Sequence, residues 1–335
     1  MDSQFRQSTS ARKTISSGMT VFICCWALIL GTLLNADALL AGAEQKPFGA
    51  SRTNWLRVWR PVHYVSHALY LDRPREWLDD SLGRSRATTS FIDSQPPPTV
   101  SGPDTPATPI PSKLRTPDRE HPLRLWVGGD SMAQVFGQSL VSIGDGTGLV
   151  TSELDYRIST GLSRPDVFDW PRELASIVGR PESPDVLVIV FGANDSQGLK
   201  TPDGAIFQPE TDGWRTEYRR RVAATMDIVR GQGRLVVWLG QPVVRDEGFS
   251  RRLREVNSIF REEAAIRPGV IFLDSWELFV DPSGQYTPFI RDESGNEEAM
   301  RQADGIHLTR AGGDRLATAV LKRIAAEAQA DFGLR

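Results

Sequence analysis

Between residues 121 and 335, apolar residues gather in five short runs separated by longer amphipathic segments. The runs cover residues 123–127, 149–158, 186–191, 235–239 and 270–273. Their length and residue types are typical of buried strands. Helical spacing of apolar positions predicts helices at residues 132–143, 167–179, 214–230, 250–266 and 311–330. Strands that alternate with helices indicate an α/β domain with a parallel sheet covered on both faces.

The N-terminal segment has the pattern of an exported protein. Residues 1–20 are polar and carry three basic side chains and one acid, whereas residues 21–43 are apolar apart from a break at Asn35-Ala36-Asp37. The apolar run ends on Ala41-Gly42-Ala43, which suits signal cleavage, and it is also long enough to be a transmembrane anchor. Basic residues before the run keep the N-terminus in the cytoplasm. We therefore expect a membrane protein with its bulk on the periplasmic side, or a secreted or periplasmic one if residues 1–43 are removed.

Two further segments precede the α/β domain. Residues 44–82 mix Trp, Arg and Leu and predict one or two amphipathic helices, broken near Pro61 and Pro74, beside the membrane. His63 and His67 have the spacing of metal ligands on one helix face, but no acidic motif accompanies them, so exposed or packing histidines are preferred. Residues 83–120 are rich in Pro, Ser and Thr and predict a disordered linker, so the folded domain spans residues 121–335.

Composition narrows the classes of function. Of 335 residues, 40% are hydrophobic and 24% charged, as in a globular protein, and a net charge of −3 argues against a nucleic-acid partner. The two cysteines, Cys24 and Cys25, both lie in the apolar segment, so the soluble part has no thiol metal site. We expect neither a metal nor another cofactor.

Polar residues that could carry chemistry stand at the ends of the predicted strands. Ser131 follows the first strand, Gly161 the second and Asn194 the third, and Asp304 and His307 precede the last helix. In an open α/β sheet such positions converge on one edge. Each also has a structural interpretation. Ser131 can cap a helix, Asn194 can form an Asx-turn, and Asp304 and His307 can cap the last helix, for which Thr309 is an equal candidate.

The small number of histidines selects a base for a serine nucleophile. His121 precedes the sheet and two others lie beyond the linker, which leaves His307 as the one histidine downstream of Ser131 in the folded region. Asp304, three residues earlier, can orient its ring. The Ser131 and Gly161 amides and the Asn194 side chain are candidate donors to an oxyanion. Together these positions indicate catalysis more strongly than any one alone.

The same residues resemble a known superfamily. Gly129-Asp130-Ser131, Gly161, Gly192-Ala193-Asn194-Asp195 and Asp304-Gly305-Ile306-His307 are similar to four sequence blocks of the SGNH (GDSL-type) hydrolases. Finer details at residues 238–242, 274–276 and 301–305 resemble its bacterial DUF459 branch. The resemblance covers about residues 123–335. Met132 stands where the commoner motif has Leu, which is a mild departure.

The resemblance implies a flavodoxin-like three-layer α/β/α sandwich and ester hydrolysis without a metal. It implies Ser131 as nucleophile, His307 as base and Asp304 as its orienting acid, with an oxyanion hole formed by Ser131, Gly161 and Asn194. The G-x-S-x-G elbow of ordinary α/β-hydrolases is absent at Ser131.

The substrate is less well determined by the sequence. Export and the linker favour esters at the cell surface, above all O-acetyl groups on cell-surface or exported carbohydrate. Arg245 and Arg301, with Arg291, are candidates for binding an acidic sugar, although surface or ion-pair roles are commoner for arginine. Trp214 and Trp276 are candidates for stacking on a sugar, with packing on the sheet as the default.

Two other functions stay open at this stage. An O-acyltransferase would use the same three residues with a sugar hydroxyl in place of water. A non-catalytic envelope-assembly protein could retain the scaffold alone, but the presence of Ser131, Asn194, Asp304 and His307 speaks against a decayed site.

Overall fold

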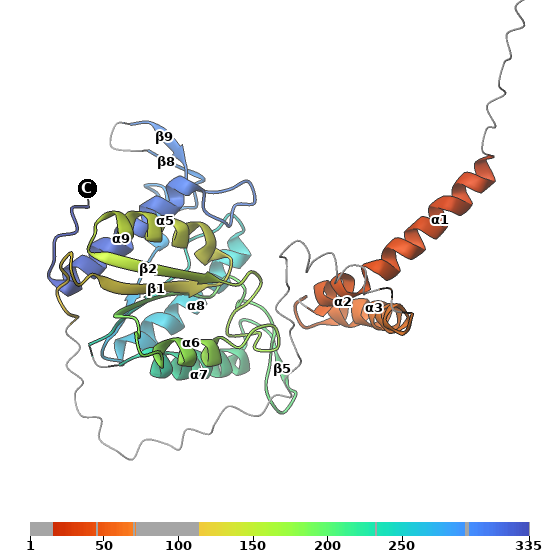
Figure 1. Cartoon of the computed structure of the whole chain (residues 1–335), viewed down its shortest axis with the longest axis horizontal. Helices are drawn as coiled ribbons and strands as arrows, with labels where there is room; N and C mark the ends of the chain where they lie inside the picture. Colours follow the sequence, from red (N-terminus) through yellow and green to blue (C-terminus); the bar gives the residue numbers. More distant parts are fainter. Residues whose placement is uncertain are drawn as a thin grey trace, which may run out of the picture. The chain divides into compact units, whose positions relative to one another are not determined.

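The computed structural model describes residues 16–44, 46–69, 71, 114–231, 233–291 and 295–334. The chain divides into two compact units, residues 1–92 and 93–335, which are described separately (Figure 1).

In the first unit, the apolar segment forms two helices instead of one. Helix α1 spans Ser17–Leu34 and helix α2 spans Ala36–Glu44. Asn35 ends α1 because its side chain donates to the Gly31 carbonyl, 2.8 Å away, and its amide turns back to Thr32. With a mean hydropathy of 2.0, α1 is long and apolar enough to cross a membrane, a test that a signal sequence also passes. The expected span at residues 21–43 falls on both helices, α1 and α2, and stays a prediction.

Helix α3, Ala50–Ala68, runs through Pro61 without a break, so the predicted break there is wrong. Proline removes one backbone donor, but contacts between α3 and the other two helices hold the segment helical. Leu56 is buried, and the His63 ring lies 2.9 Å from Asp37 Oδ1. Within the described residues no group of three metal-ligating side chains is found, around His63 and His67 or elsewhere. The predicted break at Pro74 lies outside the described residues.

The second unit is built on a parallel sheet of five strands. The strands are β1 (Leu123–Gly129), β2 (Val150–Tyr156), β3 (Val186–Val190), β6 (Leu235–Leu239) and β7 (Val270–Leu273), in the order β2-β1-β3-β6-β7. This is the flavodoxin-like order, in which the chain leaves β1 toward both sides of the sheet. The predicted fold class is confirmed.

Helices cover both faces of this sheet (Figure 1). Helices α5 (Met132–Gly146) and α9 (Arg310–Ala328) pack together on one face. The other face carries α6 (Trp170–Val178), α7 (Asp212–Val229) and α8 (Glu247–Ala265). Short elements complete the unit: β4 (Leu199–Lys200), β5 (Ile206–Phe207), the 3₁₀ helix Trp276–Phe279, β8 (Phe289–Arg291) and β9 (Glu297–Ala299).

The continuous apolar runs are explained by burial on both sides. In β3, Val186, Val188 and Val190 join the core beneath α5 and α9, whereas Leu187 and Ile189 join the core beneath α6, α7 and α8. Because neither face meets water, the strand has no polar alternation. The edge of the sheet where the strands end is therefore where polar residues can gather.

The folded unit begins earlier than residue 121. Leu114 is buried, Arg115 forms an ion pair with Asp185 at 2.8 Å, and Thr116 Oγ1 donates to the Ala328 carbonyl. Residues 114–120 thus pack on the domain and do not belong to the linker. Composition predicted a linker because residues 114–120 contain Pro and Thr. An extended segment of that composition can also pack on a folded domain, as it does here. The rest of the predicted linker, residues 83–113, lies outside the described residues.

We predict that this packed stretch stabilises the domain. A fragment of residues 110–335 should have a free energy of unfolding about 3 kcal/mol above that of a fragment of residues 122–335, since the shorter one loses a buried leucine and the Arg115 contacts. Urea unfolding measures the difference. Leu114→Ala in the longer fragment should account for about 2 kcal/mol of it. Equal stability of the two fragments would show that residues 114–120 are a linker after all.

Candidate active site

The last two positions of β1 have room only for glycine. Gly129 has φ +151°, and a Cβ added there would lie 1.9 Å from the Val190 carbonyl oxygen at the end of β3. At Gly128 a Cβ would lie 2.4 Å from the carbonyl oxygen of Asp155 in β2. The chain therefore passes tightly between the ends of β2 and β3 before α5 begins. This passage places Ser131 at the edge of the sheet where the strand order reverses.

Ser131 does not cap α5. It has a helical backbone conformation and its side chain makes no capping hydrogen bond. Asp130 accepts the bond instead, from the Met132 amide to Oδ1 at 2.8 Å. The capping alternative for Ser131 is thus wrong, and its hydroxyl is free to meet another side chain.

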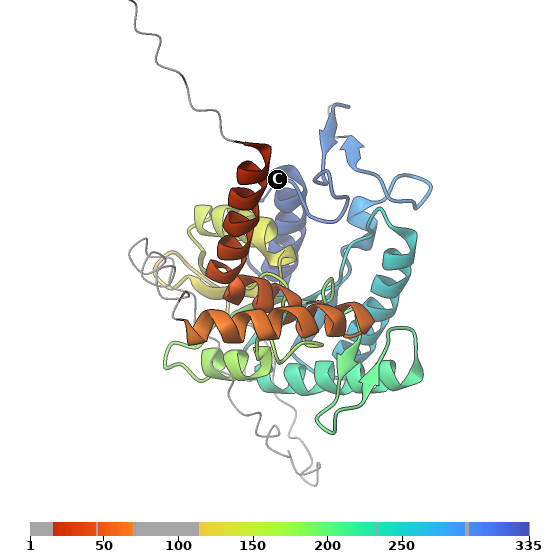
Figure 2. The same cartoon turned by 90° about the vertical axis from the view of Figure 1, so that its right-hand side faces the viewer.

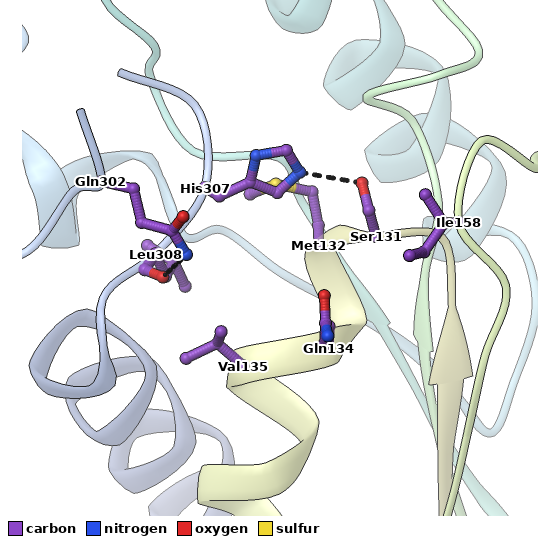
Figure 3. Close-up of a pocket in the computed structure, with 8 residues that line it drawn as sticks. All are labelled: Ser131, Met132, Gln134, Val135, Ile158, Gln302, His307 and Leu308. Carbon is purple, nitrogen blue, oxygen red and sulfur yellow. Dashed lines mark hydrogen bonds between the residues drawn. The ribbon is translucent and has the colours of Figure 1, made fainter. Parts of the chain in front are cut away.

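That other side chain is His307, 176 positions further along the chain (Figure 3). Its Nε2 lies 3.0 Å from Ser131 Oγ, and its Nδ1 lies 2.6 Å from Asp304 Oδ2. When Nδ1–H donates a hydrogen bond to Asp304, Nε2 carries a lone pair that can accept the serine proton. Asp304, His307 and Ser131 therefore form one continuous hydrogen-bonded series.

Asp304 is held in its charged form. Partial burial would raise its pKa, but hydrogen bonds from the His307 ring and from the amides of Ile306 and His307 keep the pKa below its ordinary value. The helix cap is Thr309, whose Oγ1 accepts from the Gly312 amide at 3.1 Å. The capping alternative for Asp304 and His307 is thus wrong, because Thr309 fills that position.

Asn194 has an unused donor at the same edge. Its Nδ2 is buried and has no hydrogen-bond partner among the described residues. Its backbone carbonyl accepts from the side chains of Gln197 and Ser163, and its backbone amide donates toward the Asp130 carboxylate. A buried N–H group without an acceptor costs free energy, so its presence points to an acceptor that binds there.

A buried carboxylate joins Asn194 to the loop that holds Gly161. Asp195 accepts from the Ser163 amide and from the Tyr218 hydroxyl, each at 2.7 Å. A Cβ at Gly161 would lie 2.3 Å from Asp195 Oδ1, so only glycine allows this approach. The structure thus brings together the two segments on which the predicted oxyanion donors lie.

Helix α7 braces this loop from the far side. Tyr218 holds Asp195, and Arg221 donates to the carbonyls of Leu162 and Ser163 at 2.9 and 3.2 Å. These residues were missed by sequence reasoning, because their spacing fits any amphipathic helix and nothing local marks them.

Two acids beneath the site are also a structural finding. Burial and, to a lesser extent, the neighbouring Asp195 raise the pKa of Asp130 to about 7, although hydrogen bonds from backbone amides oppose the shift. Burial likewise raises the pKa of Asp195. Their places in Gly-Asp-Ser and Asn-Asp were visible in the sequence, but their complete burial was not.

A pocket of about 200 Å³ opens beside Ser131 and His307 (Figure 3). Four apolar side chains and two glutamines surround the pair: Met132, Val135, Ile158, Leu308, Gln134 and Gln302. Ile158 is 61% exposed and stands on the far side of Ser131 from His307. The pocket is small and mainly apolar, which suits a short acyl group.

The predicted arginine ligands do not line this pocket. Arg301 is 4% exposed, and its guanidinium donates to the carbonyls of Val243 and Ile306, each at 2.7 Å, over the Phe279 ring. Burial lowers the pKa of Arg301 to about 10. This residue fixes the loop that carries His307, so the sequence-based role in substrate binding is wrong for it.

Arg245 and Arg291 lie elsewhere as well. Arg245 is exposed, donates to the Ala303 carbonyl at 2.9 Å, and packs against Gly305 from behind the turn. Arg291 faces Glu297 on the surface. Trp214 and Trp276 are buried, which supports the packing interpretation. Burial of a long side chain depends on distant segments, so the sequence alone did not reveal these placements.

Comparison with known proteins gives the class and then the family. The chain is an α/β protein with a serine, a histidine and an aspartate joined at the switch point of a flavodoxin-like sheet. Residues 124–323 match the family described as "Protein of unknown function (DUF459)", and the chain belongs to this family. No curated protein matches the sequence.

Several solved structures are similar to this chain at low identity. One, titled TesA, is 20% identical with a TM-score of 0.41, and the match covers 61% of this chain and 99% of that one. A mutant of Axe2, an acetylxylan esterase from Geobacillus stearothermophilus, is 13% identical with a TM-score of 0.43. That match covers 66% of this chain and 98% of the Axe2 chain. The C-terminal catalytic domain of peptidoglycan O-acetyltransferase A from Streptococcus pneumoniae is 13% identical with a TM-score of 0.40. That match covers 62% of this chain and 95% of the other.

We predict that Arg301 is a structural brace. Arg301→Met should lower the free energy of unfolding by about 3 kcal/mol, because two buried carbonyls lose their donors. Arg245→Ala removes an exposed arginine that lies between β6 and α8 and donates to the Ala303 carbonyl, and it should cost about 1 kcal/mol or less. Urea unfolding of both variants tests this. An Arg301→Met variant of unchanged stability would return Arg301 to the candidates for substrate binding.

Proposed function

We propose that this protein is an extracytoplasmic serine esterase of the SGNH type. It hydrolyses acyl esters, chiefly O-acetyl esters on cell-surface or exported carbohydrate. The observation that carries the proposal is the series from Asp304 Oδ2 through the His307 ring to Ser131 Oγ, with spacings of 2.6 and 3.0 Å. The basic N-terminus and the apolar helix α1 support a position outside the cytoplasm.

In the first step, Ser131 Oγ attacks the carbonyl carbon of the ester while His307 Nε2 takes the hydroxyl proton. Asp304 stabilises the imidazolium that results and keeps Nδ1–H directed toward itself. The carbonyl oxygen becomes an oxyanion. When the tetrahedral intermediate collapses, His307 gives its proton to the departing sugar oxygen, and an acyl group stays on Ser131.

The oxyanion needs donors that already point at it. We assign the backbone amides of Ser131 and Gly161 and the side-chain Nδ2 of Asn194. The unpartnered, buried Nδ2 supports this assignment, since an incoming oxyanion would supply its missing acceptor. The Asp195 carboxylate holds the Gly161 loop in place and is a positioning group only.

In the second step, water attacks the acyl group, again with His307 as base, and Ser131 is released with a carboxylic acid. Each proton transfer is assigned to a side chain of the chain itself. A sugar hydroxyl that replaced water at this stage would make the product a new ester, so hydrolysis and acyl transfer share the first step.

We predict that Ser131→Ala lowers kcat/KM for 4-nitrophenyl acetate by at least about 10³-fold, since the nucleophile is lost. Asn194→Ala should lower kcat by about 10²-fold to 10³-fold and change KM little, because its donor acts on the transition state. Initial rates of the purified variants measure both effects. The matched control is Ser258→Ala, which removes a hydroxyl that donates to Glu262 on α8. This variant should keep full activity. A fully active Ser131→Ala variant would refute the assignment.

We also predict a limit on acyl length. The rate should fall from 4-nitrophenyl acetate to butyrate and fall again to octanoate, because the pocket holds only about 200 Å³ and Val135 and Leu308 line it. Val135→Ala should relax the limit and speed butyrate more than acetate. Rates that rise with chain length in the unmodified protein would contradict a short-acyl site. Measuring acetate release from a set of acetylated glycans would identify the carbohydrate that carries the ester in the natural substrate.

A further inference from the structure

Helix α3 carries three separate stripes of residues along its length. The packed stripe is Arg52, Leu56, Trp59, His63 and Ser66. The apolar stripe, continued one residue past the helix end, is Trp55, Val58, Val62, Val65 and Leu69. The basic stripe is Arg57, Arg60, Tyr64 and His67. Members of each stripe are three or four positions apart, so each stripe occupies one face of the helix.

The packed stripe joins α3 to the other two helices of its unit. Ser66 Oγ donates to the Leu33 carbonyl in the last turn of α1 at 2.7 Å, and His63 Nε2 lies 2.9 Å from Asp37 Oδ1 in α2. Arg52 Nε donates to the Glu44 carbonyl at 3.2 Å. As Figure 2 shows, α3 lies across the end of α1 and does not continue its direction.

Four of the five residues of the apolar stripe are exposed within this unit, and Val62 is half-buried. The exposed fractions are 43% for Trp55, 50% for Val58, 44% for Val65 and 59% for Leu69. A continuous row of large apolar side chains on a protein surface marks a surface that contacts another apolar phase. Helix α1 is mainly apolar, has no buried residue, and is exposed over residues 17–30.

We propose that the apolar stripe lies in the interface of the same bilayer that α1 crosses, with α3 parallel to the membrane plane. The inference rests on the retention of α1 as an anchor and is independent of the esterase proposal. A helix that lies across the end of a membrane-spanning helix falls at the depth of the headgroups. There the apolar stripe meets acyl chains, and Trp55 and Trp59, whose rings stack at 5.7 Å, sit at the boundary that tryptophan favours.

The charges on the neighbouring face indicate the lipid. Arg57 and Arg60 are exposed and lie one turn apart, and among the described residues of α3 there is no acidic side chain. Such a face is attracted to anionic headgroups. The occupant of the apolar stripe is therefore a bilayer that contains anionic lipid, and not a second copy of the chain.

Labels on two adjacent residues test this proposal. In a full-length Cys24→Ser, Cys25→Ser background, Val65→Cys and Tyr64→Cys each receive an environment-sensitive fluorophore. The proteins are reconstituted into vesicles of phosphatidylcholine and phosphatidylglycerol. We expect doxyl-labelled lipid to quench the label at residue 65 several-fold more than the label at residue 64, and aqueous iodide to show the reverse order. Tyr64, 75% exposed on the basic stripe, is the matched control.

Three outcomes would overturn the proposal. Equal iodide quenching at both residues would place the apolar stripe in water. Shielding of residue 65 that persists in detergent and grows with protein concentration would assign the stripe to a second copy. Removal of residues 1–43 from the mature protein, seen by intact mass, would remove the anchor on which α3 depends. Arg57→Gln with Arg60→Gln should abolish any gain in lipid quenching that phosphatidylglycerol brings, and an undiminished gain would refute the role of charge.

Discussion

The close approach of three strand ends at Gly128 and Gly129 is the constraint on which the candidate site depends. A side chain at either position would collide with the main chain of β2 or β3. The passage delivers Ser131 to the edge of the sheet with its hydroxyl unengaged by the helix that follows. The other site residues come to Ser131 from distant segments. His307 lies near the end of the chain, and Asn194 follows β3.

The two sides of the sheet contribute different parts of the proposed machinery. The loop before α9 carries Asp304 and His307. Arg301 holds this loop in place by donating to the Ile306 carbonyl within it and to the Val243 carbonyl in the segment after β6. The face covered by α7 positions Gly161 and Asn194, two of the proposed oxyanion donors, because Tyr218 and Arg221 hold Asp195 and the loop after β2. The base and the donors thus rest on separate cores, with Ser131 between them. A change in either core should disturb only its own half of the site.

The sequence predicted β3 and β6 well because their apolar runs are buried on both faces and a glycine follows within two residues. Residues 235–239 and 270–273 agree with the observed strands without adjustment. It also brought Ser131 together with Asp304 and His307, since few histidines were available and the motif order was informative. It failed for Arg301 and for residues 114–120, because burial in both cases depends on segments far along the chain. The continuity of α3 through Pro61 likewise depends on tertiary contacts that outweigh a local signal.

The central claim is that Ser131 is the activated nucleophile, and covalent labelling tests it most directly. The protein is treated with a serine-directed phosphonate ester, and the adduct is located by peptide mass spectrometry. The account predicts a single adduct on Ser131, formed much more slowly in His307→Ala because the base is lost. An adduct on another serine, or labelling of Ser131 at the same rate without His307, would contradict it.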